Sequence, residues 1–191
     1  GWKVSNLVDC CKEKPAYGAN SPSVPYTSEL PRYIRITDIT DDGRLVESAK
    51  VSLEISGNEH YVLRDGDFLF ARSGATVGKT YLFRESDGWA AFAGYLIKFV
   101  VDEDYLLADY LKQFTQSLQY SNWVKASIRA GAQPNINAQE YSQLPIPLPP
   151  LPEQRKIAQI LSTWDEAITL VEALIAALKR RKQGLMQRLL T

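Results

Sequence analysis

The last quarter of this 191-residue sequence constrains the fold more than any other part. A proline-rich joint, Pro149-Pro-Leu-Pro-Glu-Gln154, leads into a long segment whose apolar side chains recur in alternating steps of four and three. That spacing, kept over about five heptads, is typical of the contact line of a coiled coil, and a helix of this length runs roughly 50 Å. Such a helix extends well past a small domain, so we expect it to bind another helix. The apolar line comprises Ile157, Leu161, Trp164, Ile168, Val171, Ile175, Leu178, Leu185 and Leu189, with Lys182 as its polar member.

The rest of the sequence has the composition of an ordinary soluble domain. Hydrophobic residues make up 45% of the chain, which is enough for a core of normal size. No apolar run approaches the ~18 residues that a membrane span needs, and no secretory signal is present. The first residue is Gly1 instead of Met, which fits a processed or shortened start. Adjacent Cys10 and Cys11 are poorly placed for a structural disulfide, so we expect a reducing, cytoplasmic setting.

Charge is balanced over the whole chain but divided unevenly along it. Residues 1–152 carry 15 basic against 18 acidic side chains, whereas residues 153–191 carry 7 against 4. Because non-specific affinity for DNA grows with the phosphates neutralised, the first part would bind DNA weakly alone and rely on basic partner subunits. The basic run Lys179-Arg-Arg-Lys182 is either a solvated helix end that complements the helix dipole or a contact with a partner or phosphate.

Hydrophobic patterning predicts a mixed α+β domain over residues 1–148, followed by the joint and helix of residues 149–191. Asp104 is a plausible N-cap for a helix that continues to Leu118, and a second, shorter helix fits residues 121–128. Alternating prolines make residues 144–148 extended. The expected strands are residues 33–37, 68–72, 80–83, 89–92 and 95–100.

A glycine-rich segment, Gly74-Ala-Thr-Val-Gly-Lys-Thr80, invites comparison with a nucleotide-binding phosphate loop. That loop needs four residues between its glycines and opens a helix, whereas here there are three and a strand is expected to follow. We therefore predict no ATP or GTP site. The segment is either a tight hairpin that needs glycine, or a place where Arg72 and Lys79 approach a phosphate backbone.

The sequence offers little to support catalysis. It lacks the Asp/Asn-Pro-Pro-aromatic run of adenine methyltransferases, and its single histidine, His60, lies in a polar stretch typical of an exposed loop. Without a Cys/His cluster a zinc site is not expected. Acidic pairs such as Asp41 with Asp42 fall in turns, where acids are ordinary. We predict no catalytic residue, no metal and no cofactor in this chain.

Two groups of polar residues could instead read DNA. Amide side chains pair bidentately with adenine edges, and Gln133, Asn135 and Asn137 lie in a predicted loop, although they could equally stabilise the turn around Pro134. A strand over residues 33–37 would place Tyr33, Arg35 and Thr37 on the face opposite the core. These side chains could contact DNA, or they could simply be exposed to solvent. The predicted DNA-contacting residues are Tyr33, Arg35, Thr37, Arg72, Ser73, Lys79, Arg129, Gln133, Asn135 and Asn137.

Together these segments resemble one half of a type I restriction–modification specificity subunit, with one target recognition domain and one helical spacer. The most specific match is Leu144-Pro-Ile-Pro-Leu-Pro-Pro-Leu-Pro-Glu-Gln-Arg-Lys-Ile-Ala158. The other matching segments are Tyr33-Ile-Arg-Ile-Thr-Asp-Ile39, Gly66-Asp-Phe-Leu-Phe-Ala-Arg-Ser-Gly-Ala-Thr-Val-Gly-Lys79, Asn135-Ile-Asn137 and Gly184-Leu-Met-Gln-Arg-Leu189.

The resemblance implies a role that the residues alone do not. Members of this family read a bipartite DNA target and recruit modification subunits, which methylate adenine with S-adenosylmethionine. Restriction subunits join to cleave unmodified DNA with ATP and Mg. Two spacer helices pair antiparallel and set the gap between half-sites, so the apolar line would face a second helix. Lys182 within that line would then fix the register.

This chain departs from the family pattern in carrying one recognition domain and one spacer instead of two of each. It is either a half subunit that forms a homodimer or a fragment of a longer subunit. In a homodimer, two-fold symmetry would make the two half-sites identical and inverted.

Two other functions remain open at the level of sequence. The chain could be an assembly subunit that docks partners without reading DNA, or the specificity arm of another restriction–methylation enzyme. Replacing Arg72, Lys79 and Arg129 by alanine distinguishes the assembly role from DNA recognition. A chain that recognises DNA would lose DNA binding and would still form its dimer.

Overall fold

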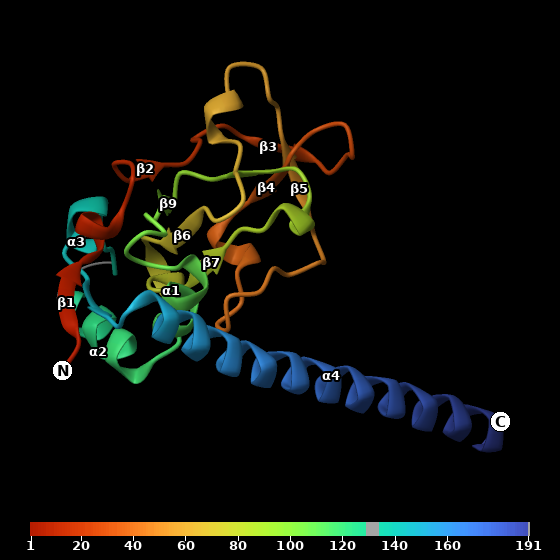
Figure 1. The fold of residues 1–191 in the computed structure, drawn as a ribbon. Helices are drawn as coiled ribbons and strands as arrows, with labels where there is room; N and C mark the ends of the chain where they lie inside the picture. Colours follow the sequence, from red (N-terminus) through yellow and green to blue (C-terminus); the bar gives the residue numbers. More distant parts are fainter. Residues whose placement is uncertain (129–133, 191) are drawn as a thin grey trace.

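Sheets and short helices form a rounded α+β domain from which one long helix, α4 (Leu151–Leu190), extends (Figure 1). The computed structural model describes residues 1–128 and 134–190. The C-terminus lies at the far end of α4, away from the rounded part. The fold class and the long helix are as the sequence predicts. No helix in the described ranges is both long enough and apolar enough to cross a membrane.

Three sheets make up the β part of the domain. One has the order β2 (Ala16–Tyr17), β9 (Leu96–Phe99), β6 (Phe68–Ala71), β7 (Thr80–Leu82), with all neighbours antiparallel. The second has the order β3 (Ser23–Pro25), β5 (Val51–Leu53), β4 (Arg32–Ile34), β8 (Ala90–Phe92), in which β4 and β8 are parallel. The third pairs β1 (Lys3–Asn6) with β10 (Pro145–Leu148) antiparallel.

Short helices connect and cover these strands. The α-helices of the domain are α1 (Ala108–Phe114), α2 (Leu118–Ser127) and α3 (Ala138–Ser142). The 3-10 turns span Leu7–Cys10, Ile36–Asp38, Glu59–Tyr61, Gly74–Thr76 and Glu85–Asp87.

Strand β6 lies at the centre of the domain because both of its faces are apolar. Side chains alternate across a strand, so Phe68 and Phe70 pack into the cluster that contains α1 and α2. Leu69 and Ala71 pack into a second cluster formed with β4, β7 and β8. Because β6 is packed on both faces, its position in the domain is well defined. The residues that follow its end at Ala71 are therefore also held in place.

The predicted strand over residues 33–37 is wrong beyond Ile34. The Asp38 carboxylate accepts a hydrogen bond from the Arg35 backbone N–H at 2.9 Å, and the Asp38 N–H donates to the Arg35 carbonyl at 3.0 Å. Together these bonds favour a 3-10 turn over Ile36–Asp38, because a local side-chain acceptor competes with the sheet ladder. The expected alternation of faces therefore stops where the strand ends.

The predicted N-cap at Asp104 is also wrong, because α1 begins only at Ala108. The Asp102 carbonyl accepts the N–H groups of Tyr105 and Leu106 in a turn that precedes the helix. The N–H of Leu107, the residue before α1, instead donates to Gln154 Oε1 at 3.0 Å. A side chain from α4 thus satisfies a free donor at the start of α1, which no local pattern predicts.

Gln154 joins α4 to the domain. It is fully buried, and its Nε2 donates to the carbonyls of Tyr105 and Pro149, both at 2.9 Å. Ala158, one turn later, is also buried against the domain. The proline joint followed by glutamine thus fixes the direction in which α4 leaves the domain.

Candidate nucleic-acid interface

One cluster of predicted DNA-contacting residues forms where the end of β6 meets residues 134–137. The Ile136 N–H donates to the Arg72 carbonyl and the Gly74 N–H to the Pro134 carbonyl, both at 2.9 Å, with Ser73 and Asn135 as antiparallel bridge partners. Segments about sixty residues apart in sequence are therefore neighbours. Ser73 is half-buried and Asn135 is exposed, so the edge carries both side chains near the surface.

Arg72 is held against an aromatic ring in this edge cluster. Its guanidinium lies 4.9 Å from the centre of the Tyr17 ring, a cation–π contact. Within residues 1–128 and 134–190, Arg72 Nε is a buried side-chain nitrogen without a hydrogen-bond partner. The Arg72 N–H donates to the carbonyl of Tyr95, whose side chain is 60% exposed. A guanidinium held against tyrosine in this way has a fixed planar fork, which is suited to a planar acceptor such as a base edge or phosphate.

Asn137, the last member of the edge cluster, has a structural role. Its Oδ1 accepts the Glu140 N–H at 2.9 Å and its own N–H donates to Glu140 Oε2 at 2.8 Å, which is a capping box for α3. Tyr17 supports the same helix start, because its hydroxyl accepts the Ala138 N–H at 3.1 Å. Asn137 therefore stabilises the start of α3 and not the turn around Pro134, whereas Asn135 keeps an exposed side chain.

Lys79 and Arg35 both form ion pairs with acidic residues of the segment 38–41. Lys79 Nζ donates to the Ile39 carbonyl at 3.1 Å and forms an ion pair with Asp41 at 3.0 Å. Arg35 forms an ion pair with Asp38 at 2.9 Å, and the hydrogen bond to Asp38 raises the pKa of Arg35. Both cations already have acidic partners, so they would have to exchange these for a phosphate.

Tyr33 is not on the surface, contrary to the face assigned to it from the sequence. It is 4% exposed, and its hydroxyl donates to the Ala19 carbonyl at 2.6 Å. Side chains on both faces of β4 are buried, since Tyr33 packs into one apolar cluster and Ile34 into another. Thr37 is exposed in the 3-10 turn that follows. Arg129 and Gln133 lie outside the described residues.

The glycine-rich segment forms the connection between β6 and β7. As the sequence predicts, a strand follows it and not a helix. The Tyr120 hydroxyl donates to the Gly78 carbonyl at 2.8 Å, and the Tyr141 hydroxyl accepts the Gly78 N–H at 3.2 Å. Burial raises the pKa of both phenols, which keeps them protonated. Gly78 has φ of +88°, and an added Cβ would lie 2.7 Å from Val124 Cγ1, so glycine is required by the packing.

Residues beside the cluster that the sequence did not single out are Tyr17 and Tyr95. Tyr17 reaches the site because β2 pairs with β9, and Tyr95 because its carbonyl binds Arg72. Both depend on contacts between distant strands, so no local motif marks them.

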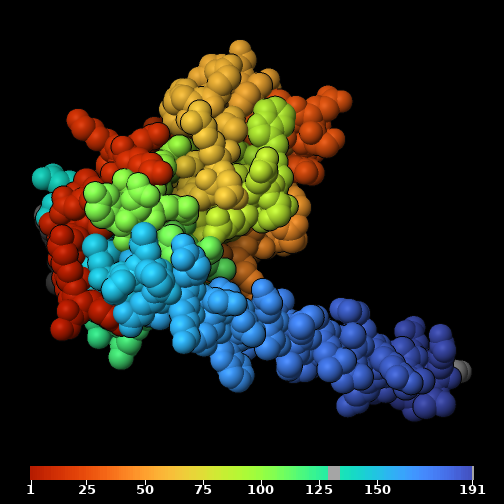
Figure 2. All heavy atoms as spheres, viewed as in Figure 1, coloured from red at the N-terminus to blue at the C-terminus, as the bar shows by residue number. Residues whose placement is uncertain are grey.

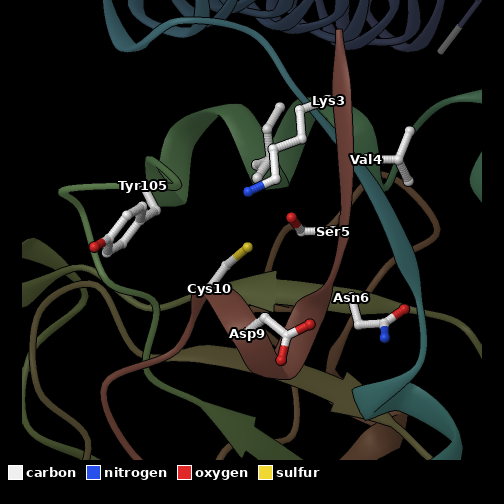
Figure 3. Close-up of a pocket in the computed structure, with 8 residues that line it drawn as sticks. Lys3, Val4, Ser5, Asn6, Asp9, Cys10 and Tyr105 are labelled. Atoms are coloured by element: carbon white, nitrogen blue, oxygen red, sulfur yellow. The ribbon is translucent and has the colours of Figure 1, made fainter.

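A surface hollow elsewhere on the domain is lined by β1 and the turn after it (Figure 3). Lys3, Ser5 and Cys10 point into it, whereas Val4 points away from it. None of the predicted DNA-contacting residues that the structure describes lines this hollow. Among the described residues, no group of three or more His, Cys, Asp or Glu could hold a metal ion.

Comparison with known proteins identifies the class. The family described as type I restriction modification DNA specificity domain matches residues 1–180. The chain belongs to this family.

Individual relatives agree with the assignment. The chain is 24% identical over 192 aligned residues to the type I restriction enzyme MjaVIII specificity subunit of Methanocaldococcus jannaschii, covering all of this chain and 42% of that one. Over 89 residues it is 39% identical to the putative MjaX specificity subunit of the same organism, covering 47% of this chain and 20% of that one. The chain thus spans less than half the length of these curated relatives.

Solved structures share the fold. The HsdS subunit from Thermoanaerobacter tengcongensis matches 98% of this chain with a TM-score of 0.63 and 20% identity, over 48% of its own length. A chain from a structural study of complex assembly and conformational transition of the type I R-M system matches all of this chain with a TM-score of 0.66 and 21% identity, over 49% of its length.

Proposed function

We propose that this chain reads one half of a bipartite DNA target and takes no part in the chemistry. The observation that carries the proposal is the pairing of residues 134–136 with residues 72–74, which sets Arg72, Ser73 and Asn135 along one edge. Arginine pairs with guanine edges and asparagine with adenine edges, so this edge has the donors and acceptors for direct readout. Tyr17 and Tyr95 beside Arg72 supply aromatic contact area.

The chemistry would reside in partner subunits. Modification subunits would bring S-adenosylmethionine and methylate adenine, and restriction subunits would use ATP and Mg to cleave unmodified DNA. This chain would contribute no catalytic residue and no cofactor. Family membership supports this division of labour.

Helix α4 would supply the second half of the function by pairing antiparallel with another spacer helix. Its apolar line is exposed along nearly its whole length, with Trp164 at 66%, Val171 at 55% and Leu178 at 54%. Figure 2 shows the second half of α4 projecting beyond the domain with nothing packed against it in this view. A large exposed apolar surface on a soluble protein marks an interaction site.

The role of Arg72 can be tested with DNA selected from a random duplex library by the wild-type protein. Arg72→Ala is expected to weaken binding of the selected duplex by roughly tenfold or more, since one bidentate base contact is worth about 1–3 kcal/mol. Arg72→Lys should restore only part of the loss, because lysine lacks the planar fork. Fluorescence anisotropy measures both affinities.

Arg64→Ala, at an exposed arginine that precedes β6 and so lies toward the opposite end of that strand from Arg72, serves as the matched control. Unchanged affinity of the Arg72→Ala variant, at wild-type thermal stability, would contradict the placement of DNA on this edge. If the wild-type protein selects no sequence while still forming dimers, the assembly role would replace DNA reading.

A further inference from the structure

We propose that the hydroxyl groups of Tyr141 and Tyr120 position Arg72 and Ser73 for sequence-specific readout of DNA, without touching DNA themselves. The inference rests on the proposed function, because it concerns the edge formed by residues 72–74 and 134–136. It gives a role in specificity to two residues whose side chains are buried in the core.

The turn of residues 72–77, which connects β6 with β7, is braced from within. The Thr76 hydroxyl donates to the Ser73 carbonyl at 3.0 Å, and the Val77 N–H donates to the Gly74 carbonyl at 3.2 Å. Because internal hydrogen bonds hold the shape of the turn, its orientation on the domain depends on how its two ends are held.

Tyr141 holds both ends of this turn. Its hydroxyl donates to the Ala71 carbonyl at 2.8 Å and accepts the Gly78 N–H at 3.2 Å. Ala71 directly precedes Arg72, and Gly78 directly follows the turn. The Gly78 N–H also donates to the Ala71 carbonyl at 3.2 Å, so one hydroxyl bonds to both members of a backbone pair. Tyr141 is fully buried, so solvent does not compete for these bonds.

Tyr120 holds the second end of the turn from a different helix. It lies in α2, and its hydroxyl donates to the Gly78 carbonyl at 2.8 Å. The N–H and the carbonyl of Gly78 are therefore each bonded to a phenol. The peptide planes on both sides of Gly78 are held in this way.

Tyr141 also connects the turn with the segment that carries Asn135. It lies in α3, whose capping residue Asn137 follows Asn135 by two positions. The Tyr141 N–H donates to the Asn137 carbonyl at 3.0 Å, within the first turn of that helix. The backbone and the side chain of one residue thus hold the two segments that form the edge.

The rings of the two tyrosines have a separate role in core packing. The Tyr141 ring centre lies 4.7 Å from that of Phe70 and 5.8 Å from that of Trp123. The Tyr120 ring stacks on Trp123 at 6.3 Å. Phenylalanine at either position would keep these ring contacts and lose only the hydroxyl. Replacing tyrosine by phenylalanine therefore separates positioning from packing.

Base readout and phosphate contact differ in how much geometry they require. A bidentate contact between an arginine and a base edge needs both donors in place, so a displacement of about 0.5 Å weakens it. Contacts with phosphates carry no sequence information and provide most of the non-specific affinity. Loss of a positioning hydroxyl should therefore lower affinity for the target sequence more than affinity for DNA in general.

Fluorescence anisotropy with two duplexes tests this expectation, one selected by the wild-type protein and one of random sequence. Tyr141→Phe should weaken binding of the selected duplex by roughly tenfold, the size expected for one buried hydrogen bond. Binding of the random duplex should change by less than about twofold. In a chain that already carries Arg72→Ala, Tyr141→Phe should cost less than about threefold more, because a positioning group acts through the residue it positions.

Tyr110→Phe is the matched control. Tyr110 is 4% exposed, and its hydroxyl donates to the Pro147 carbonyl at 2.9 Å, so this variant also loses a bond between a buried phenol and a carbonyl. It should lower the midpoint of thermal unfolding about as much as Tyr141→Phe and leave both DNA affinities unchanged. Tyr120→Phe should act in the same direction as Tyr141→Phe, and it provides the test if the Tyr141 variant does not fold.

Three results would overturn the proposal. The first is wild-type affinity for the selected duplex in the phenylalanine variants that fold. The second is equal weakening of the selected and random duplexes, and the third is a loss that simply adds to that of Arg72→Ala. Failure of the proposed function is distinguishable, because Arg72→Ala alone would then leave the affinity for the selected duplex unchanged. That result would remove the positioning role as well.

Discussion

Replacing Ile175 by aspartate is expected to leave the protein monomeric at concentrations where the wild-type chain dimerises. Ile175 is 46% exposed on the free helix and would be covered by the second helix. Each dimer would lose two buried apolar side chains, worth about 1.5–3 kcal/mol each, and would gain two carboxylates in their place. The dimer dissociation constant should therefore rise by more than about 100-fold. Analytical ultracentrifugation measures the change.

Leu170→Asp provides the matched control for this experiment. Leu170 is 71% exposed and lies on the same helix, but it falls outside the a and d positions. The two variants change an apolar side chain to the same acid only five residues apart. Equal weakening by both would mean that the apolar line is not the contact surface.

Replacing Gln154 by alanine is expected to cause the largest loss of stability among substitutions in the joint. The side chain is fully buried and links the Leu107 N–H with the carbonyls of Tyr105 and Pro149. Removing it leaves three backbone groups without this partner, and each group that water does not reach costs about 1–3 kcal/mol. We expect a free energy of unfolding lower by about 3 kcal/mol, measured by urea denaturation.

Gln159→Ala, an exposed glutamine on the next turns of α4, is the control and should change stability by less than about 0.5 kcal/mol. If Gln154→Ala lowered the free energy of unfolding no more than Gln159→Ala, the attachment of α4 to the domain would rest on the prolines and Ala158 and not on Gln154. The Gln154 variant should also lose the fixed direction of α4, which small-angle scattering would detect as a broader distribution of distances.

The long helix could be predicted from sequence because its signal is local. Apolar residues recur there with a period near 3.5, directly after a proline-rich segment. This pattern can be recognised without knowing how the rest of the chain folds. Strands β6, β7, β8 and β9 were predicted for the same reason, since each is a short apolar run between turn residues. What the pattern could not give is the order of strands in the sheets, because pairing joins residues far apart in sequence.

The errors in the sequence prediction have a shared physical cause. Residues 35–38 leave the strand because the Asp38 carboxylate offers the Arg35 N–H a local acceptor. Helix α1 starts late because Gln154, more than forty residues away, supplies the acceptor at its start. Single side chains with several hydrogen bonds override propensity, and their partners are not visible in a window of sequence.

At the candidate site, too, features that depend on residue type could be predicted from the sequence, and features that depend on contacts between distant segments could not. Arg72, Ser73 and Asn135 were singled out by residue type, and the structure places them on one edge. Tyr33 was singled out by an alternation that ends one residue later, and it is buried. Tyr17 was not singled out, because only the pairing of β2 with β9 places its ring beneath Arg72.

We propose above that a restriction–modification complex obtains its DNA sequence specificity from this chain. The most direct test maps methylated adenines across the genome of the source cell, with the gene intact and with it deleted. We expect a two-part methylated sequence that disappears on deletion, with inverted identical halves if a second copy of this chain supplies the other half. An unchanged methylation map, in cells shown to make the protein and its modification subunits, would exclude the proposed role in DNA recognition.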